Sequence, residues 1–131
     1  MKNAGDIMSK DILTVRSKDS IAKTIGIMID YKVSGLPVVN EYNEVIGVIS
    51  ENDLLTIHEL YENNTGSGMD THIMTVDTFM TPNPITIKQD MSIKDVSKIL
   101  VEKRIKRLPV VDSSRILLGV VSRSDILKLL R

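Results

Sequence analysis

The chain has 131 residues, is 42% hydrophobic, and carries 17 basic and 17 acidic residues, so its formal net charge is zero. This length allows about one domain, the lack of cysteine excludes disulfides, thiol catalysis and zinc–thiolate sites, and no apolar run approaches the roughly 20 residues of a membrane span. Balanced charge and a 3% aromatic content provide neither the phosphate neutralisation nor the stacking that nucleic-acid binding requires. The start of the chain lacks the apolar stretch of a signal peptide. We therefore expect a cytoplasmic protein that binds neither membranes nor nucleic acid.

The first half of the chain alternates short β-branched runs with amphipathic patterns. Residues 12–15 predict a short strand, and Ser20 is a suitable N-cap for the helix that follows. Residues 36–39 and 45–49 predict two strands joined by a polar turn, which is the pattern of a hairpin, and a second helix is expected over about residues 51–61. The apolar face of the first helix consists of Ile21, Ile25, Met28 and Ile29.

The second half repeats this order of elements after a polar linker. Residues 62–68 are polar and contain two glycines, and Pro82 and Pro84 prevent regular helix, so the chain enters the second half extended. A strand over residues 85–87 precedes a helix, at whose start Ser92 and Asp95 have the spacing of a capping box. The remaining pattern consists of apolar helix positions Ile93, Val96, Ile99 and Leu100, strands over 108–111 and 116–121, and a last helix that ends at Leu130.

The two halves match at a constant offset of 72 residues, which indicates a duplicated structural unit. Met8 returns as Met80, and the Leu-Pro-Val-Val of residues 36–39 returns at 108–111. Two copies of a small unit usually pack face to face, so the seam between them can hold a ligand. We expect repeat 1 over residues 6–61, a linker over 62–76 and repeat 2 over 77–131.

Each repeat carries a Ser-x-x-Asp motif where a buried strand is expected to pass into a helix. The pairs are Ser50 with Asp53 and Ser122 with Asp125. A helix start exposes unpaired N–H groups that suit phosphate, and a carboxylate one turn in can accept hydrogen bonds from the two hydroxyls of a ribose. The same spacing is also that of a capping box, in which the pair only satisfies its own helix. Its double occurrence, each time after Gly-Val and downstream of Leu-Pro-Val-Val, favours the ligand site.

These motifs closely resemble a tandem pair of CBS domains, the Bateman module named after cystathionine β-synthase. The resemblance extends over about residues 6–130, and it rests on residues 33–39 with Gly47-x-x-Ser-x-x-Asp and on residues 106–112 with Gly119-x-x-Ser-x-x-Asp. It implies an α/β (α+β) fold in which two pseudo-symmetric β-α-β-β-α repeats pack sheet to sheet.

The resemblance also implies a ligand that contains adenosine, namely AMP, ADP, ATP or S-adenosylmethionine, in clefts between the two repeats. Asp53 and Asp125 would hold the ribose. No cofactor is obligatory, although Mg²⁺ can accompany a polyphosphate. The other implied contacts are Thr14, Val15, Thr86 and Ile87 at the adenine, Ser50, Ser122 and Ser124 at the phosphate, and the segments Ser34-Gly35-Leu36-Pro37 and Lys106-Arg107-Leu108-Pro109.

The two copies differ in charge just before their Leu-Pro sequences. Ser34-Gly35 carries no charge, whereas Lys103-Arg104-Ile105-Lys106-Arg107 is basic. Lys103 and Arg104 are equally consistent with a solvated helix end, because cations favour a helix C-terminus. Lys106 and Arg107 lie beyond the expected helix end, and the resemblance places basic residues of this segment at the phosphates. Our hypothesis is that the two clefts are unequal, with phosphate held chiefly by Lys106 and Arg107.

A metal site and an active site are both disfavoured. His72 lies near Asp70 and Asp77, but this spacing matches no established ligand motif. Neither Ser-x-x-Asp pair has a histidine at a spacing that would activate a nucleophile, and phosphate-binding glycine motifs are absent. The favoured interpretation is a regulatory sensor of adenine nucleotides, not an enzyme.

Two alternatives stay open: a structural or dimerisation module with no nucleotide, and a module for an S-adenosylmethionine-type ligand. The resemblance further implies a homodimer formed through exposed helices. It also implies an effector protein that receives the signal.

Overall fold

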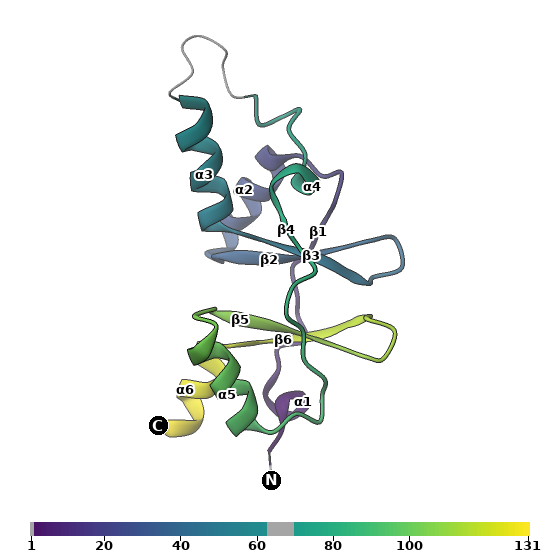
Figure 1. Ribbon diagram of the computed structural model, residues 1–131, viewed down its shortest axis with the longest axis vertical. Coiled ribbons are helices and arrows are strands. Elements are labelled where there is room, and N and C mark those ends of the chain that lie inside the picture. The colour runs from purple at the N-terminus through teal and green to yellow at the C-terminus, as the bar shows by residue number, and fades with distance from the viewer. Residues whose placement is uncertain (1, 63–69) are drawn as a thin grey trace. The chain divides into compact units, whose positions relative to one another are not determined.

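The computed structural model describes residues 2–62 and 70–131 and is a mixed α/β fold with two sheets, which confirms the predicted class. The chain divides into two compact units (Figure 1). The first-repeat unit contains Leu13–Glu41 and Ile46–Pro84, and the second-repeat unit contains Met1–Ile12, Tyr42–Val45 and Ile85–Arg131. The glycine-containing part of the predicted linker lies outside the described residues.

The sheet of the first-repeat unit has the strand order β1-β2-β3-β4. The strands are β1 (Val15–Arg16), β2 (Gly35–Val39), β3 (Val45–Ser50) and β4 (Thr81–Pro82). β1 is parallel to β2, with Val15 opposite Val38, and is shorter than the predicted strand over 12–15. Continued one residue towards the N-terminus, this register would set Thr14 opposite Pro37, which has no N–H to extend the ladder. Proline therefore favours a short strand here.

The helices of the first-repeat unit are α2 (Ile21–Tyr31), α3 (Glu51–Glu62) and the short α4 (Val76–Phe79). The predicted N-cap is confirmed, because Ser20 Oγ accepts a hydrogen bond of 3.0 Å from the Lys23 N–H. Ile21 and Met28 on α2 are buried in one core cluster with residues of the strands, as the 3.6-residue periodicity predicts.

The second-repeat unit contains α1 (Ala4–Ile7), α5 (Ile93–Glu102), β5 (Arg107–Val111), β6 (Leu117–Ser122) and α6 (Arg123–Leu130). β5 and β6 form an antiparallel hairpin, and α5 and α6 contact each other on one face of it (Figure 1). Single bridges from Ile87 to Val110 and from Ser9 to Val120 stand where the first-repeat unit has β1 and β4. The second-repeat unit thus has a two-stranded sheet, with single bridges at the places of the two outer strands of the first-repeat sheet.

The segment that precedes each repeat in the sequence belongs to the unit of the other repeat. Residues 1–12, with α1, belong to the second-repeat unit, and α4 and β4 belong to the first-repeat unit. Met8 lies against Gly119, where an added Cβ would be 2.5 Å from the Met8 sulfur, and Met80 lies in the same way against Gly47. The two glycines admit these methionines because they have no side chain of their own.

The turn Tyr42–Val45 also belongs to the second-repeat unit. The Val45 N–H donates to the Arg115 carbonyl at 3.0 Å, and the Leu117 N–H donates to the Asn43 carbonyl at 3.0 Å. The Arg115 guanidinium in turn donates to the Val45 carbonyl at 3.2 Å. These backbone pairs hold together two turns that are about seventy residues apart in sequence.

The Lys18–Asp77 ion pair gives the first-repeat unit an acid-sensitive contact. Lys18 Nζ lies 2.7 Å from Asp77 Oδ2, and the Thr75 hydroxyl also donates to Asp77. The hydrogen bond from Lys18, followed by that from Thr75, lowers the pKa of Asp77 below its ordinary value of 3.8. A lowered native pKa stabilises the folded state above the unfolded-state pKa, and this stabilisation is lost as pH falls through the native pKa.

We expect Asp77→Asn to reduce the free energy of unfolding near neutral pH. It should have no effect below the native pKa of Asp77, which is lowered from 3.8, because the protonated aspartic acid is then neutral, as asparagine is. Because Lys18 is 81% exposed, the reduction is below about 1 kcal/mol. Urea denaturation at the two pH values measures it, with Asp90→Asn at an exposed position as the control. Equal effects of Asp77→Asn at both pH values would contradict a role for the carboxylate charge.

Candidate functional site

The first Ser-x-x-Asp motif lies at the junction of β3 and α3. The Ser50 N–H donates to Asp53 Oδ2 at 2.8 Å, and the Ser50 hydroxyl lies 3.1 Å from the same oxygen. The Glu51 N–H donates to the Ser34 carbonyl at 3.0 Å, so the loop that precedes β2 lies against the start of the helix. The fold thus brings Ser34, Ser50 and Asp53 to one place.

The second motif repeats this geometry at the junction of β6 and α6. The Ser122 N–H donates to Asp125 Oδ2 at 2.8 Å, and the Ser122 hydroxyl lies 3.0 Å from that oxygen. The Arg123 N–H donates to the Lys106 carbonyl at 2.9 Å, which is the counterpart of the contact between Glu51 and Ser34. Two sites built from distant segments therefore share one hydrogen-bond pattern.

The capping-box interpretation is correct for both motifs, and it does not exclude a ligand. In each aspartate, the hydrogen bonds from serine use Oδ2 and none of them uses Oδ1. Asp53 and Asp125 are half-buried, so their carboxylates are neither sealed in the core nor fully surrounded by water. A carboxylate held in this way satisfies its helix with one oxygen, and its other oxygen takes no part in the cap.

The predicted adenine contacts divide into buried and half-buried residues. Val15 and Ile87 place their side chains in the hydrophobic core clusters, and the Ile87 N–H donates to the Pro109 carbonyl at 3.0 Å. Thr14 and Thr86, which precede them, are half-buried. Four further predicted residues have buried side chains, so a ligand could approach only their backbone: Leu36, Pro37, Leu108 and Pro109.

The basic segment of the second repeat is held by a residue that the sequence interpretation missed. Arg123 Nε donates to the Ile105 carbonyl at 3.0 Å, in addition to the backbone bond from Arg123 to Lys106. Lys106 is exposed, and Arg107, the first residue of β5, is half-buried. Glu51 occupies the equivalent position in the first repeat and has no side-chain donor to do the same. The 72-residue offset pairs Glu51 with Arg123, and this difference between the repeats was the feature of the sequence that could have indicated the role of Arg123.

Ser124 lies exposed in the first turn of α6, where a phosphate could reach it. Gly35, the first residue of β2, is half-buried beside Ser34. With Ser124 and Gly35, all predicted ligand contacts are located, and they form one set in each unit.

The acidic residues near His72 have other partners. Asp70 Oδ1 accepts a hydrogen bond of 3.0 Å from the His72 backbone N–H, and Asp77 pairs with Lys18. In the part of the chain that the structure describes, no three metal-ligating side chains of the His, Cys, Asp and Glu types gather to hold an ion.

None of the helices in residues 2–62 and 70–131 combines the length and the hydropathy that crossing a membrane requires.

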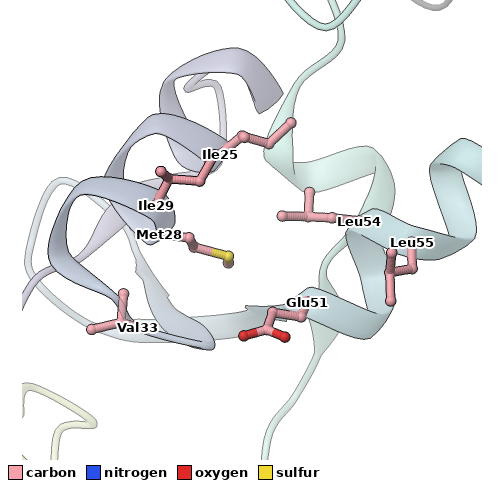
Figure 2. A pocket seen from close by; sticks show the side chains of 7 residues that line it. All are labelled: Ile25, Met28, Ile29, Val33, Glu51, Leu54 and Leu55. Carbon is pink, nitrogen blue, oxygen red and sulfur yellow. The ribbon is translucent and has the colours of Figure 1, made fainter.

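An apolar groove of about 530 Å³ lies between α2 and α3 (Figure 2). None of the predicted site residues lines it, and its one charged residue is Glu51, at the start of α3. The lining residues are Ile25, Met28, Ile29, Val33, Glu51, Leu54 and Leu55. The groove adjoins the first Ser-x-x-Asp site through Glu51, which follows Ser50, but shares none of its predicted contact residues.

The same α/β unit occurs twice, and in each copy a serine and an aspartate cap the helix at the strand-to-helix junction. The protein is therefore a tandem repeat with two equivalent polar sites. The CBS domain family matches the chain twice, over residues 4–59 and 76–131. The chain therefore belongs to the CBS domain family as a tandem pair.

Known proteins of several kinds contain a similar pair. Inosine-5′-monophosphate dehydrogenase of Methanocaldococcus jannaschii is 30% identical over 128 residues, which span 98% of this chain and 23% of the dehydrogenase. CBSX2, a chloroplastic CBS domain-containing protein of Arabidopsis thaliana, is 26% identical over 95% of this chain and 61% of its own length. The chain thus spans about a quarter of the dehydrogenase and three fifths of CBSX2.

Two solved structures are similar over nearly the whole chain. The structure of CBSX2 in complex with AMP is 27% identical, with a TM-score of 0.85, over 99% of this chain and 96% of that one. The CBS domain pair of protein MJ0100, in complex with 5′-methylthioadenosine and S-adenosyl-L-methionine, is 28% identical, with a TM-score of 0.82, over 99% and 96%. All three of these ligands contain adenosine.

Proposed function

We propose that this chain is a non-catalytic regulatory module that binds an adenine nucleotide, with Asp53 and Asp125 holding the ribose. The observation that carries the proposal is the repeated carboxylate geometry, in which Oδ2 caps the helix and Oδ1 takes no part in the cap. Two vicinal hydroxyls are donors that an ionised carboxylate accepts well. The adenosine ligands of the similar CBSX2 and MJ0100 structures support the same ligand class.

Charge in the second repeat favours a phosphorylated ligand there. Lys106 and Arg107 follow the loop that Arg123 holds against the start of α6, so their cationic groups and the helix N–H groups belong to one site. Ser122 and Ser124 add hydroxyl donors in the same turn. AMP, ADP and ATP are the ligands that use all of these groups.

The first repeat is suited to a different adenosyl ligand. Its equivalent loop, Ser34-Gly35, carries no formal charge, so Ser50 and the helix start are the phosphate donors that remain. S-adenosylmethionine and 5′-methylthioadenosine need no phosphate contact and would fit this composition. The two sites are therefore proposed to be unequal.

A thermal-shift comparison of AMP, ADP, ATP, adenosine, S-adenosylmethionine and GTP tests the proposal. A ligand that binds only the native state stabilises it by about 2.7 kcal/mol at a hundredfold excess over its dissociation constant. We expect a shift with at least one adenine nucleotide and none with GTP, and comparison with and without Mg²⁺ tests the role of the ion. No shift with any adenosine compound would leave the structural module as the better interpretation.

Arg107→Ala tests the phosphate role. We expect its affinity for AMP to fall about tenfold to a hundredfold, because a charge-assisted hydrogen bond contributes roughly 1.5–3 kcal/mol. The affinity for adenosine should not change. Isothermal titration measures both, and Lys103→Ala, at an exposed position in the same basic run, is the control. Equal losses for AMP and adenosine would contradict a contact with phosphate.

We further propose that the module works as a homodimer formed through its helices and passes its signal to an effector protein. Large apolar side chains are exposed on these helices in both repeats, which supports a protein contact at this face.

A further inference from the structure

The loops that precede β2 and β5 have the same backbone hydrogen bonds. The Val33 N–H donates to the Met28 carbonyl at 3.1 Å, and the Ile105 N–H, 72 residues later, donates to the Leu100 carbonyl at 3.2 Å. Each loop also accepts a backbone hydrogen bond from the first residue of the helix that follows the motif serine. The two loops therefore share a backbone pattern and differ in their side chains.

The first residue of that helix is Glu51 in α3 and Arg123 in α6, and both are exposed. Arg123 Nε donates to the Ile105 carbonyl at 3.0 Å, so this side chain holds the loop that leads into the basic segment. Glu51 lines the groove between α2 and α3 together with Val33, the counterpart of Ile105 (Figure 2). A carboxylate has no N–H to donate to a carbonyl. Only the second repeat can therefore hold its loop by this side chain.

Arg123 has the less favourable charge for its place in the helix. The N-terminus of a helix carries a partial positive charge, so an acidic side chain stabilises this end and a basic one opposes it. Glu51 follows this rule and Arg123 does not. Residues that break a local rule are expected at functional sites. The positive charge at the start of α6 thus requires a reason other than the stability of the helix.

The charge around the two motifs differs in sign. Residues 31–35 and 51–53 contain one basic and two acidic residues, a net charge of −1. Residues 103–107 and 123–125 contain five basic residues and one acidic residue, a net charge of +4. A phosphate monoester carries about −1.5 to −2 at neutral pH. The surroundings of the first motif therefore oppose a phosphate, and those of the second attract it.

From these observations we infer that the residue directly after the motif serine sets the ligand class of each site. Arg123 selects a phosphorylated adenosine ligand, because it holds the basic segment beside the start of α6 and adds a positive charge there. Glu51 excludes phosphate from the first-repeat site and leaves it to an adenosyl ligand without one. The inference rests on the proposed function, and it assigns a positioning and charge-bearing role to two residues outside the predicted contacts.

Isothermal titration of Arg123→Glu with AMP and with adenosine tests the role of Arg123. We expect the affinity for AMP to fall about tenfold, since the charge beside the phosphate is reversed. The affinity for adenosine should not change. Equal losses for both ligands, or no loss for AMP, would overturn the inference.

Arg131→Glu is the matched control, because it makes the same change of charge at the exposed end of α6. Eight residues of helix separate it from position 123, about 12 Å at 1.5 Å per residue. This exceeds the Debye length of about 8 Å at physiological ionic strength, so the affinity for AMP should stay unchanged. A loss equal to that of Arg123→Glu would show an effect of total charge and would overturn the inference.

Two further variants separate the charge of Arg123 from its hydrogen bond. Arg123→Lys keeps the charge, whereas Arg123→Gln keeps an N–H donor and loses the charge. We expect Arg123→Lys to retain most of the preference for AMP over adenosine, and Arg123→Gln to lose much of it. The difference between them should shrink at about 1 M salt, where the Debye length is about 3 Å. Full preference in Arg123→Gln with loss in Arg123→Lys would overturn selection by charge.

The reciprocal change, Glu51→Arg, tests the first-repeat site in a chain that also carries Asp125→Ala, which weakens the second site. We expect the affinity for AMP to rise about tenfold and that for S-adenosylmethionine to fall, because the charge beside the first motif is reversed. Glu41→Arg, at an exposed position in the turn between β2 and β3, is the control. An unchanged affinity for AMP in the Glu51→Arg chain would overturn the role of Glu51.

Inorganic phosphate distinguishes failure of this inference from failure of the proposed function. If no adenosine compound binds the natural chain, the proposed function fails. Phosphate should then still shift the amide NMR signals of residues 105–107 and 122–124 in the natural chain and not in Arg123→Glu. The same shifts in both proteins would overturn the inference. Binding of AMP and adenosine with an unaltered preference in Arg123→Glu would contradict the inference alone.

Discussion

Replacing Asp125 by alanine is expected to reduce the affinity of the second-repeat site for an adenine nucleotide about a hundredfold, because two hydrogen bonds to a charged carboxylate contribute roughly 1.5 kcal/mol or more each. The structure supplies a matched control in Asp95, which stands three residues after the N-cap Ser92, as Asp125 stands three after Ser122. Asp95 belongs to no predicted ligand contact. Asp95→Ala should therefore leave the affinity unchanged in the same isothermal titration.

The Asp125 variants also separate capping from ligand binding. Asp125→Ala removes the acceptor of the Ser122 N–H and should lower the free energy of unfolding by about 1 kcal/mol. Asp125→Asn keeps an acceptor for that N–H, so it should retain most of the stability while it loses the negative charge that favours the ribose hydroxyls. Urea denaturation measures the first effect and titration the second.

Asp53→Ala is expected to do the same to the first-repeat site, because Ser50 and Asp53 have the same geometry. The two variants need not affect the same ligand, since only the second repeat has the basic Lys106-Arg107 segment. Each variant is therefore titrated with both AMP and S-adenosylmethionine. Full affinity for the best ligand in both variants, with folding intact, would contradict ribose recognition by these carboxylates.

Gly119→Ala is expected to destabilise the fold by about 1–3 kcal/mol, whereas Gly26→Ala is expected to stabilise it by about 0.5–1 kcal/mol. A Cβ at Gly119 would lie 2.5 Å from the Met8 sulfur and 2.9 Å from the Ser9 carbonyl oxygen, which are both too close. A Cβ at Gly26, in the middle of α2, would have no atom within 4 Å other than those of its chain neighbours and the adjacent backbone of its own helix. The same chemical change thus has opposite signs at the two positions, and thermal or urea denaturation measures both.

Combining Gly119→Ala with Met8→Ala should recover part of the lost stability. Two of the three nearest atoms belong to the Met8 side chain, but the Ser9 carbonyl stays in place because its residue pairs with Val120. A full recovery or more would contradict the close approach of the Ser9 backbone. Gly47→Ala, which would meet the sulfur of Met80 at 2.6 Å, should show the corresponding loss in the first-repeat unit.

Local features of the fold followed from the sequence because they depend on neighbouring residues. Ser20 and Ser92 were predicted as helix N-caps, and each hydroxyl accepts the expected backbone N–H. The apolar faces of α2 and α5 and the two hairpins also formed as predicted, except that Ile29 of the predicted α2 face is 69% exposed. Their signals are periodicity, capping residues and turns, which act over a few residues.

The sequence also determined the candidate site residues, but not how their atoms are used. The Ser-x-x-Asp spacing allowed either a cap or a ligand site, and the structure shows that the cap occupies Oδ2 of each aspartate. The hydrogen bond from the Arg123 side chain to the Ile105 carbonyl was not predicted, because a bond between residues 18 positions apart leaves no periodic pattern in the sequence.

The tertiary structure alone decided which segments join. By itself the sequence established a duplicated unit and its local elements. It could not assign residues 1–12 to the unit that contains Gly119, or residues 81–82 to the unit that contains Gly47. Both glycines begin the same Gly-Val-x-Ser pattern, so the sequence allowed either to accept either methionine. Long-range pairing depends on the packing of the whole chain, which no local pattern records.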